Sequence, residues 1–532
     1  MIFKQGYSFS NWVCFLLTLV WMGGVAGAPR VFADWPQAAG PNGNYRVSGT
    51  TLKQFSVARN QGVRWRVSLP NTGESAPIVS RGKVFVTCHT PMKADGESGK
   101  DILGICFDAQ SGKELWRRQL PGSRETDMAS GFSDNTAASP VADGERVCFV
   151  NVGGSIRTYD YEGRLLWKHD WVPFGRHHAR QQEPILHNGK VLVLKTVAKD
   201  LPLRATTKAG AKILGRDEKY WTRLHAFDIA SGKIQWVAES ATSVHAASQW
   251  GRTAKGKAAV LTGRGGGHQP PEEPYGLSLI DAENGKTIWD LSVQGYSSHE
   301  NNVWDGRRGC CFVGMKHHEL DMLRGKLSAG VSLENDVTIC SRSGNGYVIT
   351  TGRLELAKKR KRPITYHTNC LVGNYHYFRA HQQHLIGRVN LATQTVEYLQ
   401  VPVQVDRRRP KDVLLWDKTL KNDVRNSDGF VVYQDKRATL SGWGHVSAAS
   451  PLVVGDYLYM PTMVGTVYVL NWKADQLDES ALVSISDLGI SGETWSLSSL
   501  AYSDGKIFAR TMKELICLEP VSKPAVKLPL QK

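Results

Sequence analysis

The sequence has little that would form helices or cross a membrane. Beyond residue 33 it contains no sustained helical periodicity and no apolar run long enough to span a bilayer. The glycine-rich stretch at 263–274 is not followed by the Lys-Ser/Thr pair of a phosphate-binding loop. There is also no Cys-x-x-Cys-His motif for haem attachment. These absences exclude a helical bundle, a polytopic membrane protein, a P-loop enzyme and a c-type cytochrome.

Glycine and tryptophan are abundant, with 52 and 16 residues in the chain, which is typical of short strands joined by tight turns. One pattern recurs: an aspartate after an apolar strand, a polar turn with glycine, and a tryptophan four residues after that glycine. Aspartate accepts hydrogen bonds from its own turn, and glycine adopts positive φ without a clash. Each copy is therefore predicted to be the tip and return strand of a β-hairpin. The copies span 108–116, 160–167, 228–236 and 281–289, the second being shortened.

A second pattern is a small or polar segment followed by a glycine turn and an alternating strand. Its glycines are Gly82, Gly144, Gly189, Gly256, Gly306, Gly373, Gly455 and Gly505. Together the two patterns give four short strands per unit at a period of roughly fifty residues, which indicates propeller blades. We therefore predict an all-β, eight-bladed propeller of four-stranded antiparallel blades. We expect the outer-strand tryptophans to pack between neighbouring blades: Trp65, Trp116, Trp167, Trp236 and Trp289.

The two ends of the repeat region predict that the ring closes on itself. The last unit ends after its third strand, whereas the strand at 62–70 has no unit of its own. If these strands share one blade, the ring has no open sheet edge at its seam. The predicted division is then an N-terminal extension at 34–61, the propeller at 62–520 and a C-terminal tail at 521–532.

Units five to seven depart from the pattern. A basic insertion at 354–362 belongs to unit five, Tyr398 replaces the tryptophan in unit six, and 406–444 separates units six and seven. The basic runs at 358–362 and 407–409 are interpreted as solvated loops. Because insertions on a propeller lie in its loops, where binding surfaces are built, we expect the contact surface in units four to seven.

The first 33 residues are typical of a secretory signal peptide. Lys4 precedes an apolar run at 11–27, and Val31-Phe32-Ala33 is a plausible cleavage site. A retained membrane anchor is the alternative interpretation. We expect a monomer exported to the periplasm or beyond, with no transmembrane segment once the signal is removed. The formal charge of +17 favours an anionic partner, either an envelope protein or an envelope polymer. Nucleic acid is not expected, because the chain has no recognisable reading module.

The hairpin pattern, together with S-P-x-V-x-x-G-x-V-[FY]-V, resembles the quinoprotein-like, pyrroloquinoline quinone (PQQ)-repeat propeller superfamily. The segment from Asp34 to Gly43 is similar to the opening of secreted bacterial members. The resemblance covers roughly 34–520 and includes the outer-membrane assembly scaffold related to these proteins. It implies the fold, but it says little about activity. The favoured expectation is a binding or assembly scaffold in the cell envelope, with no cofactor assigned.

A PQQ- and calcium-dependent alcohol or sugar dehydrogenase is the alternative. The dehydrogenases of the superfamily close adjacent cysteines into a vicinal disulfide over the quinone, and this chain has Cys310 and Cys311. Glu300, Asn301 and Asp305 are candidate calcium ligands and base. However, the pattern at 309–314 predicts an ordinary strand, in which neighbouring side chains point to opposite faces. The pairing of the other cysteines stays open.

Four histidines recur at similar points of units four to seven, just ahead of the first strand. With Glu300 and Asn301 they are candidate binders of a metal or an anionic ligand at the channel mouth. The alternative is that they line the channel and bond water, and a hydrolase using them with Glu300 is a third hypothesis. The adjacent pair His317 and His318 is predicted to point apart and to chelate poorly. The four histidines are His245, His299, His367 and His445.

Overall fold

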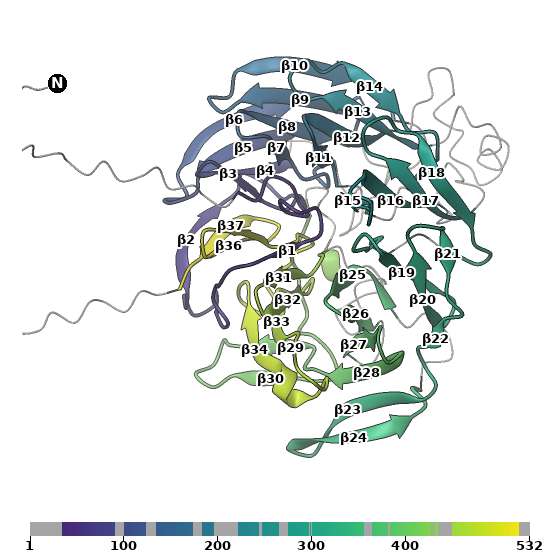
Figure 1. The fold of residues 1–532 in the computed structure, drawn as a ribbon. Coiled ribbons are helices and arrows are strands. Elements are labelled where there is room, and N and C mark those ends of the chain that lie inside the picture. Colours follow the sequence, from purple (N-terminus) through teal and green to yellow (C-terminus); the bar gives the residue numbers. More distant parts are fainter. Residues whose placement is uncertain are drawn as a thin grey trace, which may run out of the picture.

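The computed structural model is an all-β propeller of eight small sheets, as predicted (Figure 1). It describes residues 34–520 except 91–99, 124–134, 174–182, 196–221, 244–246, 265–274, 297, 299, 356–363, 381–383, 427–428, 430 and 435–448. Within that part of the chain, the helical segments are the short 3-10 turns η2 (Val432–Gln434) and η3 (Glu479–Ala481). No helix there is long and apolar enough to cross a membrane.

Blades 1 to 4 are regular antiparallel sheets of four strands each. Blade 1 holds β3 (Ile78–Ser80), β4 (Lys83–His89), β5 (Ile102–Asp108) and β6 (Glu114–Leu120). Blade 2 holds β7 (Val141–Ala142), β8 (Arg146–Asn151), β9 (Ser155–Asp160) and β10 (Leu165–Asp170). Blade 3 holds β11 (Ile185–His187), β12 (Lys190–Lys195), β13 (Arg223–Asp228) and β14 (Ile234–Val237). Blade 4 holds β15 (Gln249–Arg252), β16 (Ala258–Arg264), β17 (Gly276–Asp281) and β18 (Thr287–Ser292).

Blades 5 to 7 are irregular. In blade 5, β19 (Arg308–Val313) pairs with β20 (Lys316–Asp321), which also pairs with the short β21 (Lys326–Leu327) and β22 (Val331–Ser332). Blade 6 holds β25 (Ile364–Val372), β26 (Tyr375–Ala380), β27 (Leu385–Asn390) and β28 (Thr395–Gln400). The hairpin of β23 (Val337–Ser343) and β24 (Gly346–Gly352) extends that sheet, because β23 pairs in parallel with β28. Blade 7 holds β31 (Leu452–Val454), β32 (Tyr457–Pro461), β33 (Thr466–Asn471) and β34 (Leu482–Asp487).

Blade 8 closes the ring as the sequence predicts. Its three C-terminal strands are β35 (Ala501–Ser503), β36 (Lys506–Arg510) and β37 (Glu514–Leu518). The fourth strand is β2 (Val63–Ser68), which pairs with β37 so that Trp65 lies opposite Cys517. The first and last strands of the propeller therefore share one sheet.

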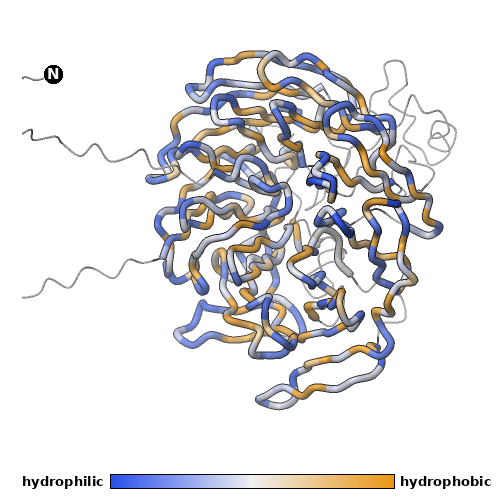
Figure 2. Tube along the Cα trace, in the orientation of Figure 1, coloured by the Kyte–Doolittle hydropathy of each residue, from blue (hydrophilic) through white to orange (hydrophobic). Residues whose placement is uncertain are grey.

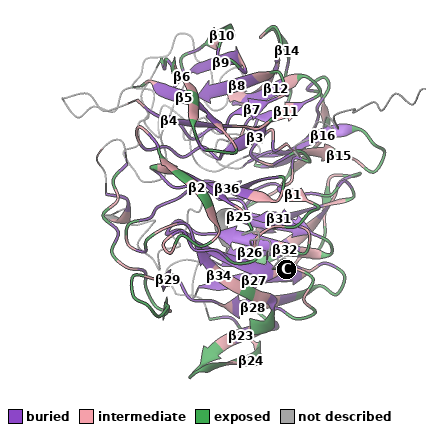
Figure 3. Cartoon of the chain, turned by 90° about the vertical axis from the view of Figure 1, so that its left-hand side faces the viewer, coloured by how far each residue is buried: buried purple, intermediate pink, exposed green. Residues whose placement is uncertain are grey.

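The hydrophobic core lies between successive blades. Hydrophobic residues recur along the strands in Figure 2, and in Figure 3 buried residues run through middle strands such as β8, β12 and β26. Between blades 1 and 2, for example, the rings of Phe85 and Phe149 meet edge to face, with centroids 6.3 Å apart. Burial of such faces on both sides of each sheet stabilises the ring.

The recurring hairpin connects neighbouring blades through a contact that we call the Trp–Gly lock. The outer-strand tryptophan of one blade packs on the hairpin glycine of the next: Trp116 lies on Gly163, where a Cβ would be 2.9 Å from the ring. That glycine has φ +80°, so both its conformation and its small size are required. The indole Nε1 donates to Tyr161 O at 2.9 Å. The other pairs are Trp65–Gly112, Trp167–Gly232, Trp236–Gly285 and Trp289–Gly325.

The part of the insertion at 406–444 that the structure describes packs beside blade 7. It begins with a hairpin of β29 (Gln404–Asp406) and β30 (Val413–Leu415). Arg407 forms an ion pair with Asp487 of β34, with Nη1 2.7 Å from Oδ2 and both side chains 6% exposed. The interpretation of 407–409 as a wholly solvated loop was therefore wrong at Arg407, because this side chain has a carboxylate partner within the fold. The basic run at 358–362 lies outside the described residues, so its interpretation as a solvated loop stays a prediction.

Candidate functional site

The inner wall of the propeller is a set of polar segments that bond to one another across blades. Ser139 Oγ of blade 2 accepts from Ala76 N of blade 1 at 2.8 Å. Its own N–H donates to Glu183 Oε2 of blade 3 at 2.9 Å. Ser498 Oγ of blade 8 donates to Glu74 O at 2.9 Å, which returns to blade 1. These bonds satisfy groups that would otherwise be buried without partners.

The N-terminal extension crosses one end of this inner wall (Figure 1). Trp35 exchanges two backbone hydrogen bonds with Val79 of blade 1, and Gln37 Oε1 accepts from Leu186 N of blade 3. Farther along, β1 (Arg46–Val47) pairs in parallel with β31 of blade 7. The extension therefore spans the ring from blades 1 and 3 to blade 7.

Tyr45 brings a side chain of this extension to the inner wall. It is 3% exposed, and burial, together with the nearby Glu183 carboxylate, raises its pKa. Hydrogen bonds to Ser450 of blade 7 and Ser499 of blade 8 act in the opposite direction. Tyr45 therefore joins the N-terminal extension to blades 7 and 8 at the inner wall.

The predicted histidine cluster falls mostly outside the described residues. This applies to His245, His299 and His445. His367 lies within β25, but its side chain is not described. The predicted ligand site at the channel mouth therefore stays a prediction.

Glu300 and Asn301 are buried, at 7% and 3% exposure, but they face different neighbours. Asn301 Nδ2 donates to Ser450 Oγ at 2.7 Å, which joins blade 5 to blade 7. The Glu300 carboxylate instead raises the pKa of Cys311, after burial as the larger cause. Asp305 accepts from the backbone of Arg307 and Arg308 in a turn. Their joint role as calcium ligands and base stays a prediction.

Cys310 and Cys311 are free thiols on opposite faces of β19. Cys310 belongs to the core between blades 5 and 6, whereas Cys311 belongs to the core between blades 4 and 5. The possible vicinal disulfide is therefore not formed, since strand alternation points the two sulfurs apart. Neither thiol is placed to cover a quinone, so the cysteine pair does not fit the PQQ site that the resemblance implies.

No disulfide is present among the eight described cysteines, all of which are buried. Cys88 of β4 and Cys106 of β5 lie on paired strands, but opposite Leu103 and Phe85 and not opposite each other. These thiols pack as small apolar side chains.

The β23–β24 hairpin is a surface feature that the sequence reasoning missed. β24 is the edge strand of a six-stranded sheet and is exposed along most of its length (Figure 3). Val348 and Ile349 are 44% and 53% exposed, and as neighbours on a strand they point to opposite faces. The signal was present, because Gly344-Asn-Gly346 separates two β-rich runs, a typical hairpin turn.

A second exposed apolar element meets this hairpin. The rings of Tyr347 and Trp416 are 6.2 Å apart, and the Arg342 guanidinium lies over the Trp416 ring at 4.6 Å. Trp416 follows β30, whose Val413 and Leu414 are 38% and 42% exposed. We call Val348, Ile349, Val413 and Leu414 the hairpin surface.

A pocket of about 320 Å³ lies between blades 8 and 1. Its wall carries cations, including Arg64 and Lys506, but also acidic side chains. Lys506 lies 3.4 Å from Asp504 Oδ2 and 3.7 Å from Glu519 Oε1, and Arg64 also pairs with Glu519. Because Arg64 and Lys506 are already paired, these two side chains are weak anion ligands.

A comparison with models of known protein families finds a match for part of this chain. A family model described as "Outer membrane protein assembly factor BamB" matches residues 98–206. No curated protein matches the chain.

Several solved structures share features of the fold. Quinohemoprotein alcohol dehydrogenase ADHIIG from Pseudomonas putida HK5 is 10% identical, with a TM-score of 0.49 over 94% of this chain and 82% of that one. The quinohemoprotein alcohol dehydrogenase from Comamonas testosteroni is 12% identical, with a TM-score of 0.47 over 94% and 83%. BamB from Moraxella catarrhalis is 14% identical, with a TM-score of 0.35 over 75% and 99%. Such low identities and scores support no inference about activity or partners.

The repeated hairpin, the closed ring of eight blades and the matched segment agree with one another. Together they make this chain similar to the PQQ-like β-propellers.

Proposed function

We propose that this chain is an exported scaffold of the cell envelope and that the hairpin surface receives its partner. The observation that carries the proposal is the exposure of β24 on both faces at a sheet edge. Natural proteins usually protect sheet edges with charged side chains, proline, bulges or a covering segment. An edge strand with apolar side chains is instead suited to pair with an added strand.

The outer strands of the regular blades provide the contrast. β18 and β2 alternate between partly buried and exposed residues, because one face packs against the next blade. β24 has a single partly buried residue, Tyr347, between its first and last positions. Its apolar residues therefore gain little from the fold of this chain, and an added strand would bury them.

The partner that suits this edge is an extended segment of an envelope protein with acidic flanks. The chain carries a formal charge of +17, and basic residues at 358–362 follow the hairpin in sequence. Acidic flanks would raise the rate of encounter, whereas backbone pairing and the burial of Val348 and Ile349 would supply the affinity. The proposal of export depends on the signal-like residues 1–33. We also propose that the chain is a monomer with three parts: an N-terminal extension at 34–61, the propeller at 62–520 and a tail at 521–532.

The experiment is chemical cross-linking in the envelope fraction of the source cells, followed by purification of this chain. The double variant Val348→Ser/Ile349→Ser should lose the co-purifying envelope protein. The matched control is Leu165→Ser/Leu166→Ser, which alters two residues of β10 that are 50% and 46% exposed. Equal recovery from both variants would refute the assignment of the surface.

The cysteine pair does not favour the dehydrogenase alternative, since the two thiols face apart. Its direct test is dye reduction with PQQ, calcium and a panel of alcohols and sugars. Quinone-dependent turnover that Cys310→Ser abolishes would replace the scaffold proposal.

A further inference from the structure

The junction between blades 5 and 6 lacks the Trp–Gly lock. The outer strands of blade 5, β21 and β22, carry no tryptophan. At the hairpin of blade 6 the lock glycine is replaced by Gln394, which adopts φ +58°. These two blades must therefore be joined by other side chains.

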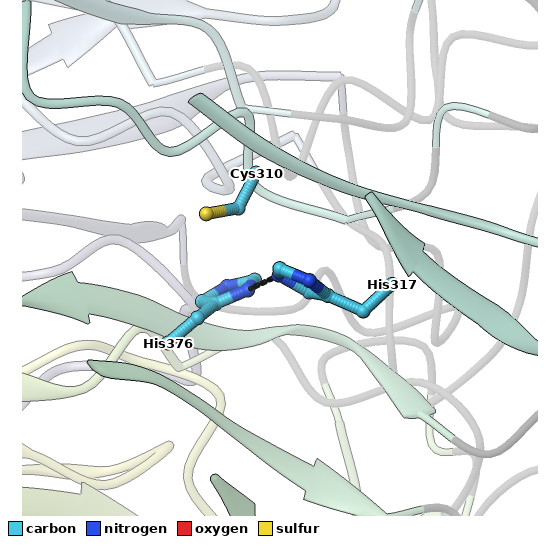
Figure 4. A group of neighbouring side chains, drawn as sticks. All are labelled: Cys310, His317 and His376. Carbon is cyan, nitrogen blue, oxygen red and sulfur yellow. Dashed lines mark hydrogen bonds between the residues drawn. The ribbon is translucent and has the colours of Figure 1, made fainter. Parts of the chain in front are cut away.

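Three potential metal ligands gather at this junction (Figure 4). Cys310 comes from β19 and His317 from β20, both in blade 5, whereas His376 comes from β26 in blade 6. One ligand atom from each residue lies within 4.8 Å of the other two. The side chains are 3%, 1% and 0% exposed, so the site is enclosed within the core.

The strand register explains how blade 5 contributes two of these residues. Phe312 lies opposite His317, and Cys310 lies opposite Glu319, so all four occupy one face of the β19–β20 pair. Cys310 and His317 are therefore diagonal neighbours on that face. The fourth residue, Glu319, accepts from Gln394 Nε2 at 2.6 Å and so joins the blades separately.

The two imidazoles are held in place by their surroundings. His317 Nε2 and His376 Nδ1 are 3.0 Å apart and share a hydrogen bond. His376 Nε2 donates a hydrogen bond to Asn369 Oδ1 at 3.1 Å. The other ring nitrogen, Nδ1, therefore carries no proton and faces the cluster. The Phe312 ring stacks on His376 and meets His317 edge to face. A hydrogen-bond acceptor on the second ring nitrogen is a common feature of metal-binding histidines.

We propose that Cys310, His317 and His376 bind one copper ion as Cu(I). A thiolate with two imidazoles is a soft ligand set, which selects copper or zinc over hard cations. Structural zinc sites almost always use four protein ligands, whereas the described residues supply three at this junction. The low coordination number and the apolar shell favour Cu(I).

Binding requires only small changes in the site. Two nitrogens at roughly 2.0 Å from one ion in a trigonal plane lie about 3.5 Å apart, so the imidazoles would separate slightly from 3.0 Å. The proton on His317 Nε2 moves to Nδ1 of the same ring, and the Cys310 thiol releases its proton. One proton therefore leaves for each Cu(I) bound, and no electron is transferred. The ion would join blades 5 and 6 where the Trp–Gly lock is absent.

The test is anaerobic titration of the purified chain with Cu(I) in competition with bicinchoninate. We expect one ion per chain and a copper X-ray absorption spectrum that shows two nitrogen neighbours and one sulfur neighbour. Binding should be lost in Cys310→Ser and His376→Gln. Asn369→Ala should weaken binding by about 10- to 100-fold, because it removes the hydrogen-bond acceptor that orients His376. The matched controls are Cys311→Ser and His318→Ala, which alter strand neighbours on the opposite faces and should bind normally.

Circular dichroism of each copper-free variant shows whether it folds. If a ligand variant does not fold, Asn369→Ala and the X-ray absorption of the unaltered chain decide the question. Copper binding that Cys310→Ser and His376→Gln leave unchanged would overturn the proposal. So would the absence of a sulfur ligand, or binding of Zn(II) without Cu(I).

Discussion

Blades 1 to 4 and blades 5 to 7 are built from the same unit but join their neighbours differently. From the seam at blade 8 to blade 5, each junction carries a tryptophan on a glycine of the next blade. From blade 5 onward the junctions use other contacts, such as Arg388 of blade 6, which bonds Ala474 O at 2.6 Å and pairs with Glu397. The extra hairpins β23–β24 and β29–β30 occur only in this second region of the described chain. The regular region repeats one packing contact, and the irregular region carries the surfaces proposed for binding.

The largest expected loss of stability comes from removing the tryptophan of one Trp–Gly lock. Trp116→Ala removes a partly buried ring and its hydrogen bond to blade 2, so we expect the free energy of unfolding to fall by roughly 2–4 kcal/mol. Thermal unfolding followed by circular dichroism measures this change. A change in stability no larger than that of Leu165→Ser would show that the lock does not hold the blades.

A smaller loss of stability is expected from Gly→Ala variants, and two of them distinguish the contribution of close packing in a Trp–Gly lock from that of the left-handed backbone conformation. Gly232 and Gly189 both have φ +71°, but a Cβ would lie 2.5 Å from Trp167 at Gly232 and meets nothing within 4 Å at Gly189. Gly189→Ala should cost about 1 kcal/mol for the left-handed conformation alone. Gly232→Ala should cost about 1–3 kcal/mol more because the tryptophan must shift. Equal losses of stability in the two variants would contradict the role of close packing.

The junction of blades 3 and 4 provides a pH test. Trp236 packs on Gly285, but its Nε1 has no hydrogen-bond partner among the described residues. Glu283 of blade 4 bridges to blade 3 instead, with Lys190 Nζ 2.6 Å and His187 Nε2 2.9 Å away. Lys190, His187 and Asn188 lower the pKa of Glu283 to about 2.

Because this pKa is lowered in the folded chain, the contribution of Glu283 is present above its usual value and is lost as the pH falls from about 4.5 to 2. The side chain is 45% exposed, so screening should limit the effect to about 1 kcal/mol or less. Glu283→Gln should therefore flatten the fall in stability across this range. A pH profile identical to that of the unaltered chain would rule out the bridge as a contributor.

The smallest effect on stability is expected in the irregular region. Val348→Ser/Ile349→Ser should change the free energy of unfolding by less than about 0.5 kcal/mol, since both residues are exposed. Chemical denaturation measures it. A loss above about 1 kcal/mol would mean that these residues already pack within this chain.

The sequence predicts the regular region well because its signals are local. The aspartate, glycine and tryptophan of 108–116 define a turn and its return strand within nine residues. The closure of β2 onto β37 is also predictable, because the last unit lacks a fourth strand and the N-terminal end has one strand without a unit. Local turn chemistry and repeat counting were sufficient for both.

The irregular region depends on contacts between distant residues. Cys310 and His317 come together through strand register, and His376 joins them from another blade, so spacing alone does not reveal the cluster. The prediction that the adjacent His317 and His318 point apart and do not chelate together is consistent with the structure, since His318 bonds Ser328 O on the exposed side. The path of the N-terminal extension across the ring was not predictable either, because Tyr45 and Gln37 bond partners far along the chain.

The central claim is that the partner binds the irregular region at β24. The most direct measurement places the photo-cross-linking residue p-benzoylphenylalanine at Ile349 or, in a separate chain, at Leu166, and irradiates the envelope fraction. The account predicts a discrete cross-linked envelope protein from position 349 and none from position 166. No cross-link at 349, or the same products from both positions, would contradict it.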